Sequence, residues 1–131
     1  MVRKKISRKI ILEFYQDIQR WESMVGYAAN ELLFLDTLLH AKAFENTAQI
    51  KTEKMLCFKL EIKTKNQEVN ELKTQMELSK NNVGAFLDCE VNSGIEFSFK
   101  DYKVLKRNFG LFNTSYNQYK TEIFKHTGGI L

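Results

Sequence analysis

The two histidines are the residues whose type and spacing could bind a metal ion. Asp36 precedes His40 by four residues, and Glu122 precedes His126 by the same interval. Residues four apart share one face of an α-helix, so each imidazole would lie beside its carboxylate. Two such pairs at one end of a helical bundle would offer two nitrogen and two oxygen ligands to Zn²⁺, Fe²⁺ or Mn²⁺. The competing interpretation is that both pairs are ordinary surface residues near helix C-termini, where the helix dipole favours a protonated histidine.

A stripe of aromatic residues could line a pocket for a haem, a flavin or another apolar ligand. It consists of Tyr102, Phe109, Phe112, Tyr116 and Tyr119. Rings at helical spacing also fill the space between packed helices, and a core is the simpler interpretation. In either case the hydroxyl groups of buried tyrosines need hydrogen-bond partners.

Basic residues gather at the start of the chain and could contact a phosphate backbone, an anionic lipid surface or an acidic protein. They are Arg3, Lys4, Lys5, Arg8 and Lys9. The net charge is +4, but residues 10–131 contain 15 basic and 16 acidic residues, so the rest of the chain is nearly neutral. A second group lies on one face of the third predicted helix and could join the first. It comprises Lys100, Lys103, Lys106 and Arg107.

No sequence motif commits the chain to a reaction. The GxSxG, HExxH, GxGxxG, P-loop and CxxC patterns are absent, which favours a non-enzymatic protein without deciding the question, and we expect no cofactor. Cys57 and Cys89 are too few for a disulfide framework, and we expect two buried free thiols. The sequence contains neither a long apolar run nor an export signal, which predicts a cytoplasmic protein without a membrane span.

Hydrophobic spacing predicts the elements that must position these residues. Every third or fourth residue from Ile11 to Leu39 is apolar, which predicts a helix over residues 7–44 with a seam of coiled-coil type. Within it, Gly26 and two alanines form a group of small residues that could mark a close approach by a neighbouring helix or ring. The seam residues are Ile11, Phe14, Ile18, Trp21, Val25, Ala28, Leu32, Leu35 and Leu39.

Two further helices follow the same spacing. The second, over residues 46–80, carries one charged residue, Lys65, among its seam residues Met55, Phe58, Ile62, Lys65, Val69, Leu72 and Met76. The third begins after Ser98 and ends before Gly128, and its seam consists of Tyr102, Leu105, Phe109, Phe112, Tyr116, Tyr119, Ile123 and His126. Asparagines and glycines predict an irregular connector over residues 81–97. The predicted fold is an all-α, elongated antiparallel three-helix bundle, with residues 1–131 in one domain.

The functional hypotheses follow from residues outside these seams. We expect Leu33, Phe34, Leu38, Leu60 and Leu78 to be exposed, because the third helix is too short to cover the other two. The first hypothesis is therefore a non-enzymatic protein-interaction or scaffold module that forms a homodimer. One alternative is a bundle that binds a small ligand or metal near His40 and His126. The other is a regulator that touches nucleic acid through the basic N-terminus.

Overall fold

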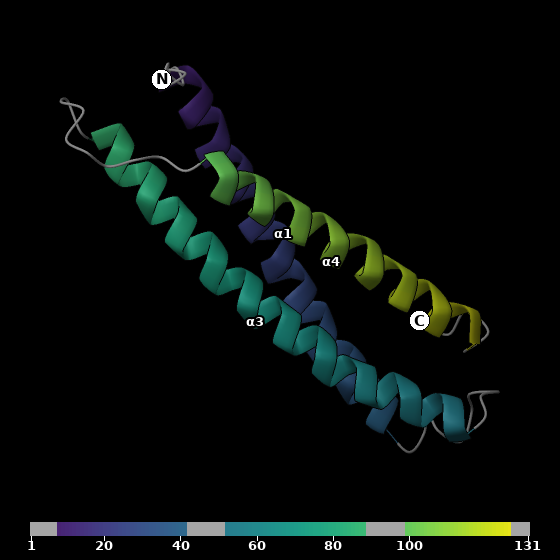
Figure 1. The fold of residues 1–131 in the computed structure, drawn as a ribbon. Helices are drawn as coiled ribbons and strands as arrows, with labels where there is room; N and C mark the ends of the chain where they lie inside the picture. Colours follow the sequence, from purple (N-terminus) through teal and green to yellow (C-terminus); the bar gives the residue numbers. More distant parts are fainter. Residues whose placement is uncertain (1–7, 42–51, 89–98, 127–131) are drawn as a thin grey trace.

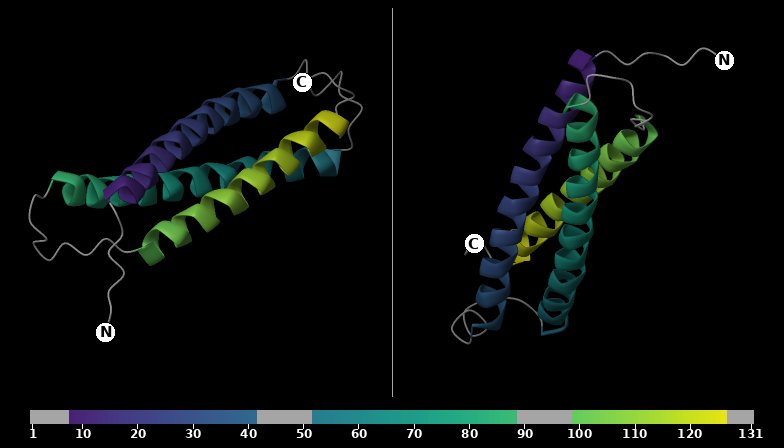
Figure 2. Two further views of the ribbon diagram at one scale, coloured as in Figure 1. Left: turned by 90° about the horizontal axis from the view of Figure 1, so that it is seen from above. Right: turned by 90° about the vertical axis from the view of Figure 1, so that its left-hand side faces the viewer.

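The computed structural model describes residues 8–41, 52–88 and 99–126, and these residues form three long helices. The helices are α1 (Arg8–His40), α3 (Thr52–Asp88) and α4 (Phe99–His126). Helix α1 packs against α3, and α3 packs against α4. Helices α1 and α4 run in one direction and α3 runs in the other (Figures 1 and 2). The predicted antiparallel three-helix bundle is confirmed.

The core consists of the side chains that the apolar spacing selects. All nine predicted seam residues of α1 are buried, as are the seven of α3. In α4 every seam residue from Tyr102 to Ile123 is buried, whereas His126 at the end is half-buried. Burial of this continuous apolar strip drives the packing of three helices that would be marginal in isolation.

The second helix extends further than its sequence predicts. Residues 81–88 continue α3, so that part of the predicted connector is wrong. Val83 lies seven residues beyond Met76 and is buried in the same seam, and Leu87 packs against the core. Tertiary packing therefore outweighs the turn preference of Asn81, Asn82 and Gly84. Residues 89–97 of the predicted connector lie outside the described residues.

Three smaller expectations about side chains are also wrong. A Cβ atom added at Gly26 would meet no other atom within 4 Å, so no neighbouring helix or ring approaches there. Cys57 is an exposed free thiol rather than a buried one, while Cys89 lies outside the described residues. Leu38 is half-buried against the core, whereas Leu33, Phe34, Leu60 and Leu78 are exposed as predicted.

Lys65 is the charged residue within the seam of α3, and only 3% of it is exposed. Its ammonium group donates a hydrogen bond to Ser115 Oγ on α4 and lies 3.5 Å from Glu68 Oε2. These partners satisfy the charge inside the α3–α4 contact. Lys65 therefore stays within the seam instead of extending into solvent.

Candidate functional site

Helices α1 and α4 face each other through large aromatic rings. The rings of Phe14 and Tyr102 are stacked, with centroids 3.9 Å apart and planes 16° from parallel. Trp21 stacks on Tyr102 at 5.7 Å and on Phe109 at 5.5 Å. These contacts hold the first turns of α4 beside the first half of α1.

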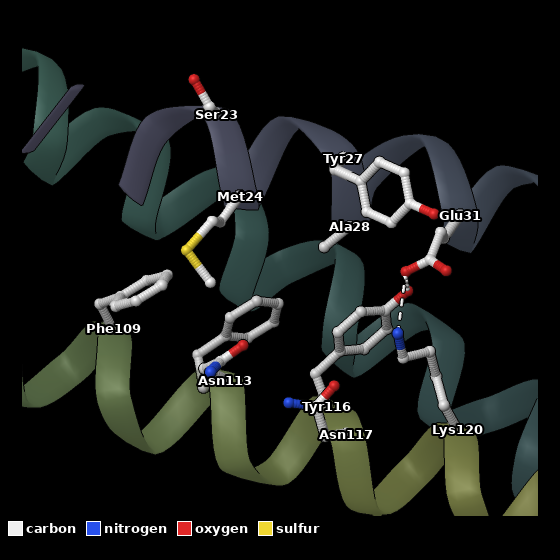
Figure 3. Close-up of a pocket in the computed structure, with 11 residues that line it drawn as sticks. Ser23, Met24, Tyr27, Ala28, Glu31, Phe109, Asn113, Tyr116, Asn117 and Lys120 are labelled. Carbon is white, nitrogen blue, oxygen red and sulfur yellow. Dashed lines mark hydrogen bonds and ion pairs between the residues drawn. The ribbon is translucent and has the colours of Figure 1, made fainter. Parts of the chain in front are cut away.

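Beyond this stack a groove opens between α1 and α4. Ala28 follows Trp21 by seven residues and occupies the equivalent seam position, but its methyl group cannot fill the space of a ring. The resulting groove has a volume of about 410 Å³. Met24, Tyr27 and Ala28 line it on α1, and Phe112 and Tyr116 line it on α4 (Figure 3).

A polar cluster closes one part of this groove. The hydroxyl of Tyr116 donates a hydrogen bond of 2.8 Å to Glu31 Oε1. The same oxygen lies 3.1 Å from the ammonium nitrogen of Lys120, which also sits 4.8 Å from the centroid of the Tyr116 ring (Figure 3). Burial raises the pKa of Tyr116, and the Glu31 carboxylate raises it further. The hydroxyl therefore remains protonated and acts as a donor rather than as a base.

The hydroxyls of the other two buried tyrosines also donate hydrogen bonds to an oxygen atom on another helix. Tyr102 donates to Asp17 Oδ2 at 2.8 Å, and Tyr119 donates to the backbone oxygen of Phe58 at 2.7 Å. Burial raises the pKa of both hydroxyls above the ordinary value of 10.0. The expectation that buried tyrosine hydroxyls find partners is confirmed. Their role here is to attach α4 to the other two helices.

An exposed aromatic ridge borders the groove on α1. We define the α1 ridge as Met24, Tyr27 and Phe34, which are 42%, 66% and 64% exposed. Their spacing of three and seven residues places them along one side of the helix. In Figure 3 the side chains of Met24 and Tyr27 extend from the α1 edge of the groove. Met24 and Tyr27 therefore belong both to the exposed ridge and to the lining of the groove.

The two histidine pairs predicted as metal ligands each form an ion pair within their own helix. His40 Nδ1 donates to the backbone oxygen of Asp36 at 2.8 Å and lies 3.2 Å from its carboxylate. His126 Nε2 lies 3.3 Å from Glu122 Oε2, and its ring packs against Phe58. Among the described residues, no three His, Cys, Asp or Glu side chains gather into a metal-binding group. Parallel helices bring both pairs to one end of the bundle, but each pair remains separate on its own helix.

The predicted basic cluster is only partly described. Arg3, Lys4 and Lys5 lie outside the described residues, whereas Arg8 and Lys9 form the exposed first turn of α1. The guanidinium of Arg8 donates to the backbone oxygen of Leu87 in the last turn of α3. Arg8 therefore satisfies a carbonyl group that has no partner within its own helix.

No protein-family model, no curated protein and no solved structure matches the chain. Within the three described helices, no segment is long and apolar enough to cross a membrane. The functional assignment therefore rests on the geometry of the chain itself.

The groove is a candidate site whose α1 side the sequence did not predict. Its signal is present at Ala28, where a small residue interrupts a series that contains Phe14 and Trp21. The size of the resulting space, however, depends on how far the rings of α4 hold that helix from α1. The aromatic-pocket hypothesis considered a ligand along the stripe on α4. All five rings of that stripe are buried in the core, and Phe109, Phe112 and Tyr116 also line the groove.

Proposed function

We propose that the protein is a non-enzymatic interaction module in which the α1–α4 groove and the α1 ridge join two copies of the chain. The observation that carries this proposal is that the exposed Tyr27 borders the aromatic groove, and that the exposed Phe34 follows seven residues later on the same side of α1. A twofold axis would place the ridge of each copy in the groove of the other. Such an interface is self-complementary, as the symmetry of a homodimer requires.

Charge on this face supports a second copy as the occupant. Glu31 and Lys120 form an ion pair within the groove, so the face carries no uncompensated charge there to repel an identical face. The amides of Asn113 and Asn117 provide further uncharged polar groups at its edge.

The available surface also favours a reciprocal contact. A standard interface covers roughly 800 Å² on each partner. The exposed two-thirds of Tyr27 and Phe34 amount to roughly 250 Å², if each ring presents about 200 Å². The ridge alone is therefore too small, and the groove must be covered as well. Reciprocal docking covers both features on both copies.

Sedimentation equilibrium on the full chain tests the proposal. We expect a concentration-dependent dimer, and we expect Tyr27→Ser with Phe34→Ser to raise its dissociation constant at least roughly 100-fold, because exposed aromatic anchors dominate such interfaces. The matched control is Leu33→Ser with Leu78→Ser, which removes two side chains that are 65% and 61% exposed on other faces. Circular dichroism would verify that both variants retain their helices.

Two outcomes would overturn self-association. The first is a wild-type monomer at high concentration, and the second is an equal loss of dimer in the control variant. A strict monomer whose groove binds a small aromatic molecule would replace the proposal with the small-ligand alternative, since the groove volume lies in the range of known ligand sites.

A further inference from the structure

The positive charge of the chain is concentrated in two short segments that are far apart in the sequence. Residues 1–9 and 99–108 together contain nine of the 20 basic residues and one of the 16 acidic residues. The remaining residues contain 11 basic and 15 acidic residues and are therefore net negative. The overall charge of +4 conceals this separation.

The fold brings the described parts of these segments, residues 8–9 and 99–108, to one end of the bundle. Helices α1 and α4 are parallel, so their N-termini lie together (Figure 1). The stacking of Tyr102 on Phe14 fixes the first turns of α4 beside the first turns of α1. We define the basic end as the exposed residues Arg8, Lys9, Lys100, Lys103, Lys106 and Arg107. The positive ends of the α1 and α4 dipoles add to this charge, and the negative end of the α3 dipole, where Arg8 binds the Leu87 carbonyl, offsets one of them.

Acidic groups near this end do not cancel the charge. Asp17 accepts a hydrogen bond from Tyr102 and pairs with Arg20 at 3.1 Å, and Glu22 pairs with Lys80 at 3.0 Å. The sequence between α3 and α4 adds only Glu90 and Glu96. Glu13, Asp88 and Asp101 are also close to this end in α1, α3 and α4. These five acidic residues are fewer than the nine basic residues of the two segments, so the end keeps a net positive charge.

We infer that the basic end binds the phosphate backbone of a nucleic acid duplex without reading its sequence. Lys100, Lys103 and Arg107 follow one another at intervals of three and four residues, which places them about 5 Å apart along one face of α4. A row of cations at this spacing suits a linear polyanion. This surface is separate from the groove, so the inference does not depend on dimerisation.

The surrounding side chains favour a duplex over a single strand or a membrane. Single-strand binding uses exposed aromatic rings as stacking platforms, but Phe14, Tyr102 and Phe109 at this end are buried. Membrane binding uses a continuous apolar face. Ile10 and Leu12 are partly exposed but lie two residues apart, so they point to nearly opposite sides of α1.

Fluorescence anisotropy with a mixed-sequence 20-base-pair DNA duplex tests this inference on the full chain. We expect binding that weakens steeply with salt, since each phosphate contact contributes about −0.9 to the slope of log affinity against log salt concentration. Replacing Lys100, Lys103, Lys106 and Arg107 by Gln should make that slope shallower by up to about 3.6 units, if each residue contacts one phosphate. At low salt the same variant should lose at least about tenfold in affinity.

A matched control separates the basic end from total charge. Replacing Lys54, Lys59, Lys63 and Lys125 by Gln removes the same charge from the opposite half of the bundle, and we expect little loss of affinity. Equal losses in the two variants would overturn the inference, as would duplex binding that does not change with salt. Binding to vesicles of anionic lipid without binding to the duplex would assign the basic end to a membrane surface and also overturn it.

Discussion

The contact of α1 with α3 and its contact with α4 are built from different side chains. The backbones of α1 and α3 approach closely along their length, whereas those of α1 and α4 do not. Between α1 and α3, Tyr15 lies 4.0 Å from where a Cβ atom on Gly84 would be. Between α1 and α4, stacked rings and tyrosine hydroxyls span the distance.

This difference explains why the groove opens between α1 and α4. Small and aliphatic side chains allow two helices to pack without a gap. Rings hold two helices further apart, so a single small residue in the ring series leaves unfilled volume. Ala28 is that residue, and the groove opens beside it. Helices α1 and α3 thus form a closely packed pair. Helix α4 packs on this pair, and the groove lies between α4 and α1.

The substitution with the largest expected effect on stability is Trp21→Ala. It removes the ring that stacks on both Tyr102 and Phe109. We expect a loss of about 3–5 kcal/mol in the free energy of unfolding. Hydrogen exchange should show that amides of α4 lose more protection than those of α3, because the stack attaches α4 to α1. Ile18→Ala is the control, since it removes a buried aliphatic side chain. An equal loss of protection in all three helices would contradict the conclusion that the ring stack mainly holds α4 to the α1–α3 pair.

Alkaline pH should weaken the attachment of α4 through its three buried tyrosines. The pKa values of Tyr102, Tyr116 and Tyr119 are raised above 10.0 in the folded protein. Their protonated forms therefore stabilise the fold fully below pH 10, and this contribution is lost as pH rises toward the folded-state pKa values. Each tyrosine should lower the free energy of unfolding by up to about 1.4 kcal/mol per pH unit in that range.

Denaturant unfolding at pH 9, 10 and 11 measures this dependence. Replacing the three tyrosines by Phe removes the titrating groups, so the variant should show a shallower decline in stability above pH 10. If the variant declines as steeply as the wild type, groups other than these tyrosines control alkaline unfolding.

Sequence periodicity predicted which side chains of each helix are buried. It did not predict how the helices are spaced relative to one another. The apolar residues of α1 could be selected from the sequence because their burial depends on the helical repeat alone. The end of α3 could not, because Val83 and Leu87 gain burial from neighbours that are distant in the sequence. The two histidine pairs were placed correctly on their helices, but the periodicity of each helix says nothing about how far apart the pairs lie, and among the described residues they form no common group.

The α3–α4 contact offers a smaller test, because its polar link includes a buried charge. Ser115→Ala removes a hydrogen-bond acceptor from Lys65 and should cost about 1–3 kcal/mol. Lys65→Met removes the charge itself and should stabilise the protein by roughly 1 kcal/mol, since Ser115 and Glu68 are only partly buried and can bind water instead. In thermal unfolding we therefore expect Ser115→Ala to lower the melting temperature and Lys65→Met to raise it. Destabilisation by Lys65→Met would show that the pair contributes net stability.

The smallest expected effect concerns Gly26, which lies in α1 next to the start of the α1 ridge. Glycine within a helix costs about 1 kcal/mol relative to alanine, and nothing lies within 4 Å of an added Cβ atom there. Gly26→Ala should therefore raise the free energy of unfolding by up to about 1 kcal/mol. Gly84→Ala is its counterpart in the α1–α3 contact, where the added methyl group would touch Tyr15 at an ordinary contact distance. A loss of stability at Gly26 alone would mean that another helix approaches α1 there, and the groove side of the molecule would then be more closely packed than the ring contacts indicate.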